Sequence, residues 1–225
     1  MQNASMIQDV SDTAFWVASY RADETARTDA LFRDPLAERL AGERGRQFAK
    51  AMPRSSMTRW SVVMRTVIID DYLRQAISDG VDLVVNLGAG LDTRPYRLDL
   101  PESLRWIEVD HPGIIDFKER ALASEPARCA LQRVALDLTN PGLRRAFLAE
   151  TGMSAKRILV LTEGVVPYLS VADAAALADD LHATPGIAYW VVDYFSAQAM
   201  KMLSNSPMQK KLQNAPFRFF SAGLA

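Results

Sequence analysis

A chain of 225 residues is long enough for one large domain, or for one domain with an extension. Hydrophobic residues make up 49% and charged residues 24%, and a net charge of −1 provides no field that would attract nucleic acid. No apolar run approaches the ~18–20 residues that span a bilayer, and residues 1–13 lack the pattern of a secretory signal. With Cys129 as its single cysteine, the chain cannot form an intrachain disulfide. Two histidines 71 positions apart, His111 and His182, argue against a histidine-based metal site. We therefore expect a cytoplasmic protein with no metal, membrane or nucleic-acid partner.

The first 80 residues show helical periodicity. A helix is predicted from Ser11 to Ala30, and Asp34-Pro35 is typical of the cap and first position of a second helix. Gly42 and Gly45 interrupt that second helix. The apolar stripe of the first helix is expected to comprise Phe15, Trp16, Ala18 and Tyr20.

The third predicted helix runs from about Ser55 to Ser78 and stops at Gly80. Its cap is expected to be Ser55 or Ser56. Its apolar face is predicted from residues at helical spacing, namely Trp60, Met64, Val67 or Ile68, and Tyr72.

After Gly80, short apolar runs alternate with helical segments. Five strands are predicted, at 82–87, 104–110, 130–136, 157–162 and 187–193. The helices between them are expected near 112–124, 141–150 and 171–182. Such alternation predicts an α/β fold with a doubly wound, mostly parallel sheet. A sheet of this kind binds its ligand outside the carboxyl ends of the strands.

A glycine-rich turn follows the first predicted strand. Gly88 and Gly90 lack a Cβ atom, so the backbone can turn sharply or a ligand can approach it closely. Asp110 ends the second strand, 20 positions beyond Gly90, where a carboxylate can accept hydrogen bonds from a ribose diol. A purely structural turn is the alternative. The strand, the turn and the acid together favour a ligand of the nucleoside type.

The residues after the turn discriminate between nucleosides. A dinucleotide-binding turn needs glycine or alanine at position 93, where this chain has Thr93 preceded by Asp92. A carboxylate there repels a pyrophosphate but is compatible with a sulfonium and an ammonium group. The phosphate-loop pattern is absent as well. These features favour S-adenosylmethionine over NAD or ATP.

Four ordered motifs carry a more specific resemblance: "VVNLGAGLDTRPYRL", "WIEVDHP", "LDLT" and "LTEGVVPYL". With the amino-terminal "FWVASYRADETARTDALFRDPLA", they resemble the S-adenosylmethionine-dependent methyltransferases related to leucine carboxyl methyltransferase, in their bacterial O-methyltransferase branch. The similarity runs from about Thr13 to Tyr194. It implies a class I methyltransferase fold, with residues 1–80 as a helical extension or lid and residues 81–225 as the cofactor-binding domain.

The resemblance also implies roles for individual residues. The turn Gly88-Ala89-Gly90 matches the cofactor loop of the family, Asp110 its ribose-binding acid, and Asp137-Leu138 its adenine-contacting pair. Glu163 matches the acid after strand four, and Arg65 an arginine that binds the carboxylate of the cofactor. Structural alternatives exist for three of these residues. Arg65 could extend from a half-buried helix, Asp137 could cap the helix from Pro141, and Glu163 could be purely structural.

Methyl transfer from a sulfonium is an in-line displacement in a site with little water. The expected acceptor is a carboxylate or hydroxyl of a small molecule, and only the hydroxyl would benefit from a general base. No catalytic residue is assigned, because His111 fits an exposed turn and packing explains the aromatic and strand-end candidates Tyr20, Tyr168, Asp193 and Tyr194 equally well. A non-catalytic nucleoside-binding protein and, less favoured, an NAD-dependent oxidoreductase are the alternatives.

Two further features concern charge and length. Residues 39–65 contain seven cations and one acid, a local charge of +6, which indicates either a lid that attracts an acidic acceptor or a solvated helical face. The class usually closes its sheet with seven strands, whereas five are predicted by Asp193, with 32 residues after it (225 − 193). We therefore expect a sheet that lacks its last strands, through truncation, completion by a partner, or degeneracy.

Overall fold

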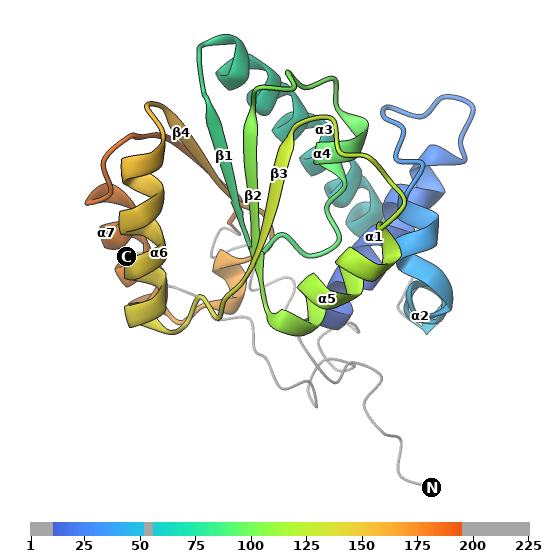
Figure 1. Cartoon of the computed structure of the whole chain (residues 1–225). Coiled ribbons are helices and arrows are strands. Elements are labelled where there is room, and N and C mark those ends of the chain that lie inside the picture. Colours follow the sequence, from blue (N-terminus) through green and yellow to red (C-terminus); the bar gives the residue numbers. More distant parts are fainter. Residues whose placement is uncertain (1–10, 52–55, 195–225) are drawn as a thin grey trace, which may run out of the picture. The chain divides into compact units, whose positions relative to one another are not determined.

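The computed structural model describes residues 11–51 and 56–194, which form two compact units. The first unit contains the described residues up to Ile68 together with Leu91–Thr93, and the second contains residues 69–90 and 94–194. The helices are α1 (Ser11–Thr25), α2 (Ala37–Ala51), α3 (Ser56–Ser78), α4 (Arg94–Arg97), α5 (Pro112–Ala121), α6 (Pro141–Ser154) and α7 (Val171–His182), with a short 3₁₀ helix at Val166–Tyr168. The strands are β1 (Leu83–Leu87), β2 (Arg105–Asp110), β3 (Ala130–Ala135), β4 (Ile158–Thr162) and β5 (Ile187–Val192) (Figure 1).

In the first unit, α1 packs against α2. The predicted stripe of α1 is confirmed, because Phe15, Trp16, Ala18 and Tyr20 are all buried. Gly45 permits the close approach of the two helices, since a Cβ atom there would lie 2.7 Å from the carbonyl oxygen of Phe15. The interruption predicted in α2 is confirmed at Gly42, which has a φ of +54°, but not at Gly45, which keeps helical geometry.

Two helix boundaries differ from the prediction. α1 ends at Thr25 rather than Ala30, and the Arg33 guanidinium donates to the carbonyls of Thr25 and Arg27 just beyond that end. These contacts satisfy carbonyl groups that a longer helix would have satisfied internally. α2 begins at Ala37, two residues after the predicted Pro35. Arg21 of α1 pairs with the buried Asp34 at 2.9 Å in the segment between the helices.

The apolar face predicted for α3 is not the face that the protein buries, so that prediction was wrong. Trp60, Ile68 and Tyr72 are 64%, 48% and 61% exposed. The buried face instead comprises Val62, Val63, Thr66, Ile69, Asp70, Leu73 and Ala76. This helix carries apolar residues on two faces, so spacing alone does not identify the buried one. The predicted cap Ser55 lies outside the described residues.

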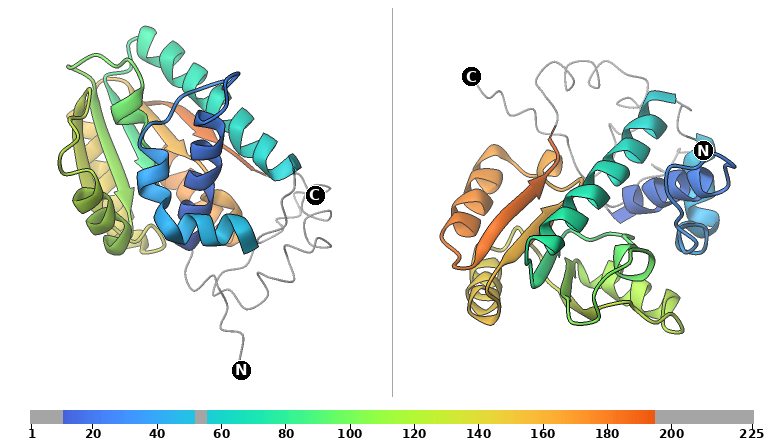
Figure 2. Two further views of the ribbon diagram at one scale, coloured as in Figure 1. Left: turned by 90° about the vertical axis from the view of Figure 1, so that its right-hand side faces the viewer. Right: turned by 90° about the horizontal axis from the view of Figure 1, so that it is seen from above.

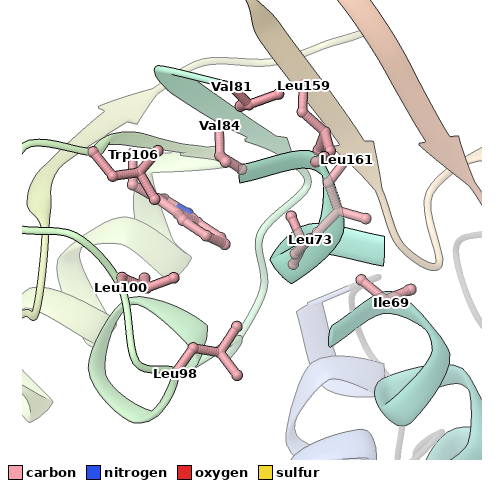
Figure 3. Packing of buried hydrophobic residues seen from close by; sticks show 11 residues of the cluster. Ile69, Leu73, Val81, Val84, Leu98, Leu100, Trp106, Leu159 and Leu161 are labelled. Carbon is pink, nitrogen blue, oxygen red and sulfur yellow. The ribbon is translucent and has the colours of Figure 1, made fainter. Parts of the chain in front are cut away.

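The second unit is an α/β sandwich around a five-stranded sheet of order β3-β2-β1-β4-β5, in which every paired strand is parallel. One face packs against the second half of α3 and the segment around α4, through a core that includes Leu73, Trp106 and Leu161 (Figure 3). The other face packs against α6 and α7, which lie together on the opposite side of the sheet (Figure 1 and Figure 2). The predicted doubly wound parallel fold is confirmed.

Candidate functional site

The parallel strands bring four predicted site residues to one edge of the sheet. Gly88 directly follows β1, Asp110 ends β2, Asp137 lies two residues after β3, and Glu163 directly follows β4. Because all paired strands run in the same direction, these positions share the lower edge of the sheet in Figure 1. Parallel α/β sheets bind ligands at this edge.

Asp110 connects the second strand to the glycine turn. One carboxylate oxygen, Oδ2, accepts the N–H of Gly90 at 2.6 Å, and the other, Oδ1, accepts the N–H of His111 at 2.7 Å. Burial raises the pKa of this carboxyl above its usual value, and the two N–H groups partly offset that effect. The turn is further fixed by the N–H groups of Gly88 and Ala89, which both donate to the carbonyl of Val109. Asp110 thus determines the shape of the turn, whatever ligand it binds.

Gly88 is required by the packing of the protein itself. Its φ is +70°, in the left-handed region that favours glycine, and a Cβ atom would lie 2.4 Å from Cγ2 of Val165. The neighbour that excludes a side chain is therefore a residue of the loop after β4. Packing within the protein is therefore enough to require glycine at position 88, and this requirement is compatible with an additional role in ligand binding. Gly90 also has a positive φ, of +48°.

Asp137 does not cap the following helix, so that structural alternative was wrong. The cap of α6 is Asn140, whose Oδ1 accepts the N–H groups of Gly142 and Leu143, both at 3.1 Å. Asp137 instead accepts the hydroxyl and the N–H of Thr139, at 2.7 and 2.9 Å, and these bonds lower the pKa of its carboxyl. The carbonyl of the adjacent Leu138 accepts a hydrogen bond from Arg144.

Glu163 has a partner that the sequence did not single out. Its carboxylate pairs with the guanidinium of Arg94 at 2.6 Å, and Arg94 pairs in turn with Asp70 at 2.7 Å. Arg94 lies in the motif "VVNLGAGLDTRPYRL", but the sequence predicted no role for it. Its position three residues before a second arginine, Arg97, was the available signal. Asp193, at the end of β5, accepts the N–H of Gly164 at 2.7 Å in the same region.

The remaining candidates lie elsewhere. Arg65 belongs to the first unit, where α3 leaves its side chain half-buried, so its role at a cofactor carboxylate stays a prediction. His111 is exposed at the start of α5, as predicted for a turn residue. Tyr20 is buried in the first unit, and burial raises the pKa of its phenol. The cations of α2 lie mostly on exposed surface and include Arg46, which pairs with Glu43. This arrangement fits the solvated helical face.

No cluster of three or more His, Cys, Asp or Glu side chains that could hold a metal ion occurs within residues 11–51 and 56–194. In the same part of the chain, every helix is too short or too polar to cross a membrane.

The fold places the chain in a class. A crystal structure of a provisionally named methyltransferase from Thermobifida fusca superimposes with a TM-score of 0.55 over 95% of this chain and 76% of its own, at 15% identity. A DUF574 family protein from Streptomyces avermitilis gives a TM-score of 0.56 over 91% of this chain and 78% of its own, also at 15% identity. With the strand order observed here, these likenesses define an α/β fold of the class I methyltransferase type.

The sequence comparisons identify the family. The leucine carboxyl methyltransferase profile matches residues 14–182, so the chain belongs to that family. A relative from Streptomyces avermitilis is 41% identical over 169 residues, which cover 70% of this chain and 59% of the relative. A relative from Frankia alni is 40% identical over 170 residues, with 70% and 58% covered. Both carry the provisional name of S-adenosyl-L-methionine-dependent methyltransferase, and the match spans about three fifths of their length.

Proposed function

We propose that this chain belongs to an S-adenosylmethionine-dependent methyltransferase that methylates a carboxylate or hydroxyl oxygen of a small molecule. Membership of the family supports the reaction class. The single observation that carries the proposal is the bond from the Gly90 N–H to Asp110, which joins a glycine turn after β1 to an acid at the end of β2. In sheets of this type, an acid at this position binds the ribose hydroxyls.

The charge at the ligand edge favours a cationic cofactor. Asp110, Asp137 and Asp193 lie at or just beyond the carboxyl ends of their strands, as does Glu163, whose charge is offset by its pair with Arg94. Asp92, which is 9% exposed, follows the turn where a dinucleotide-binding protein has small residues. An anionic pyrophosphate would be repelled by such an edge, whereas sulfonium and ammonium groups would be attracted. The donor set therefore fits S-adenosylmethionine better than NAD.

Each residue then has a defined task. Asp110 would accept the ribose hydroxyls, the turn Gly88-Ala89-Gly90 would lie against the nucleoside, and Asp137-Leu138 would contact the adenine. Glu163 would accept hydrogen bonds from the cofactor, and Arg65 would bind its carboxylate. We propose that residues 1–80 form a helical extension that covers the cofactor and shapes the acceptor pocket, and that residues 81–225 bind the cofactor.

When bound, S-adenosylmethionine supplies a methyl group on an electron-poor sulfur, which an oxygen nucleophile can displace. A carboxylate acceptor is already ionised at neutral pH and needs no proton acceptor from the protein. The protein then has to orient the acceptor and exclude water.

Isothermal titration calorimetry with S-adenosylmethionine, S-adenosylhomocysteine and NAD tests the cofactor. We expect saturable binding of the first two ligands and none of NAD. The variant Asp110→Ala should weaken binding at least tenfold, about 1.4 kcal/mol. Asp82→Ala is the matched control, because Asp82 also accepts two backbone N–H groups, from Lys156 and Arg157, but lies before β1 at the opposite edge of the sheet. Binding of NAD alone would refute the proposal.

Methyl transfer is tested separately. The protein is incubated with S-adenosylmethionine labelled in its methyl group and a small-molecule extract of bacterial cells, and labelled products are identified by mass spectrometry. An ester or ether product sensitive to Asp110→Ala supports O-methylation. Labelled products carrying the methyl on nitrogen or carbon would contradict the oxygen acceptor. Cofactor binding with no labelled product would favour the non-catalytic alternative.

A further inference from the structure

A buried chain of four charged side chains runs from α3 to the loop after β4. Arg97 donates to both oxygens of Asp70, at 2.6 and 2.8 Å. Arg94 donates from Nε to Oδ1 of Asp70 at 2.7 Å and from Nη1 to Oε2 of Glu163 at 2.6 Å. The two arginines and two acids sum to zero formal charge. All four residues belong to the second unit.

Arg94 holds two carboxylates with different nitrogens of one planar group. Because the guanidinium is rigid, the bond from Nε to Asp70 fixes the direction in which Nη1 points toward Glu163. Arg97 donates hydrogen bonds to both oxygens of Asp70 and so holds the Asp70 carboxylate in place. A lysine at position 94 would keep the charge but could not bridge the same two acids from fixed directions.

Stability does not explain this arrangement well. Burying ion pairs costs desolvation energy, and replacing such a network with apolar side chains is often neutral or stabilising. The side chains of Asp70, Arg94 and Arg97 are 2%, 2% and 4% exposed, whereas that of Glu163 is 15% exposed. The network therefore reaches the surface at its Glu163 end. That end is the edge of the sheet where the cofactor is proposed to bind.

We propose that Arg94 is a positioning residue that orients the Glu163 carboxylate, so that it can accept hydrogen bonds from the cofactor. This inference rests on the proposed function. Arg94 acts through Glu163, and Asp70 with Arg97 supports it from the buried side. Arg94, which follows the glycine turn, thus controls the orientation of Glu163, the acid after β4.

Calorimetric binding of S-adenosylhomocysteine provides the test, because this probe cannot turn over. Arg94→Met should weaken binding about tenfold or more, and Glu163→Gln should do the same. In the double variant, Arg94→Met should add less than about twofold to the effect of Glu163→Gln, since the two residues act as one unit. Arg94→Lys, which keeps the charge, should remain at least about fivefold weaker than the wild type.

Arg133→Met is the matched control for loss of a largely buried arginine. The Arg133 side chain is 11% exposed and pairs with Glu108 at 2.9 Å, joining β3 to β2. This variant should lose thermal stability but keep the wild-type affinity. If Arg94→Met destabilises the fold too far to be measured, Arg94→Lys carries the test.

The outcomes separate the inference from the proposed function. If the wild type does not bind S-adenosylhomocysteine, the proposed function fails, and this inference fails with it. If the wild type binds but the Arg94 variants bind equally well, only the positioning role is overturned. Equal weakening by Arg94→Met with and without Glu163→Gln would also overturn it, because Arg94 would then act by another route.

Discussion

Replacing Gly88 by alanine should destabilise the second unit through two separable effects. The backbone at position 88 has a φ of +70°, and an L-residue in the left-handed region costs about 1–2 kcal/mol. The added Cβ would also lie 2.4 Å from Cγ2 of Val165, and overpacking of this kind costs about 1–3 kcal/mol. The expected loss of unfolding free energy is therefore about 2–5 kcal/mol.

Urea unfolding followed by circular dichroism measures this loss. With a slope of about 2 kcal/mol per molar urea, the midpoint should fall by about 1–2.5 M. Gly113→Ala is the control, because nothing lies within 4 Å of a Cβ atom at that position and its φ is not positive. This control should be neutral, or stabilising by up to about 1 kcal/mol, since alanine is the better helix former.

A second substitution isolates the steric part. Val165→Ala removes the methyl group that the new Cβ would meet. The double variant should therefore recover the stability lost to the steric clash but not the stability lost to the strained backbone. We expect a coupling of about 1–3 kcal/mol between the two substitutions. An unchanged midpoint in Gly88→Ala, or purely additive effects in the double variant, would refute the close contact between the turn and the loop after β4.

Three further predictions concern the second unit. Asn140→Ala should lower stability by about 1 kcal/mol in urea unfolding, because the cap of α6 is lost; an unchanged midpoint would contradict this role. Lys118→Met should cost about 1–3 kcal/mol in the same assay, because it removes one of the two partners of the buried Glu108 carboxylate, which keeps its pair with Arg133 at 2.9 Å. Burial, with a contribution from Glu108, raises the pKa of Cys129 to about 11. Only about 0.1% of the thiol is ionised at pH 8, so iodoacetamide alkylation should be slow there and accelerate about tenfold per pH unit up to that pKa. Rapid alkylation of the folded protein at pH 8 would contradict the raised pKa of Cys129.

The sheet could be predicted from the sequence because its central strands are continuous apolar runs. Every residue of β1 and β4 is buried, and such runs between turn signals indicate strands covered on both faces. The short α4 could not be predicted, since four residues carry no helical periodicity. The buried face of α3 could not be identified either. With apolar residues on two sides, only the tertiary packing decides which side is covered.

The glycine turn and Asp110 were found because their signals are local: a strand, two glycines, and an acid at the end of the next strand. Arg94 lacks such a signal. Its two partners, Asp70 and Glu163, lie 24 and 69 positions away in the sequence, so only the fold brings them together. A buried arginine directly after an apolar strand and turn also departs from what local pattern rules expect of an α/β core. Departures of this kind concentrate at functional sites, where charge is retained despite its desolvation cost. The proposed orientation of Glu163 toward a cofactor gives this chain of four buried charges a role that stability does not, and the Arg94 variants test that role.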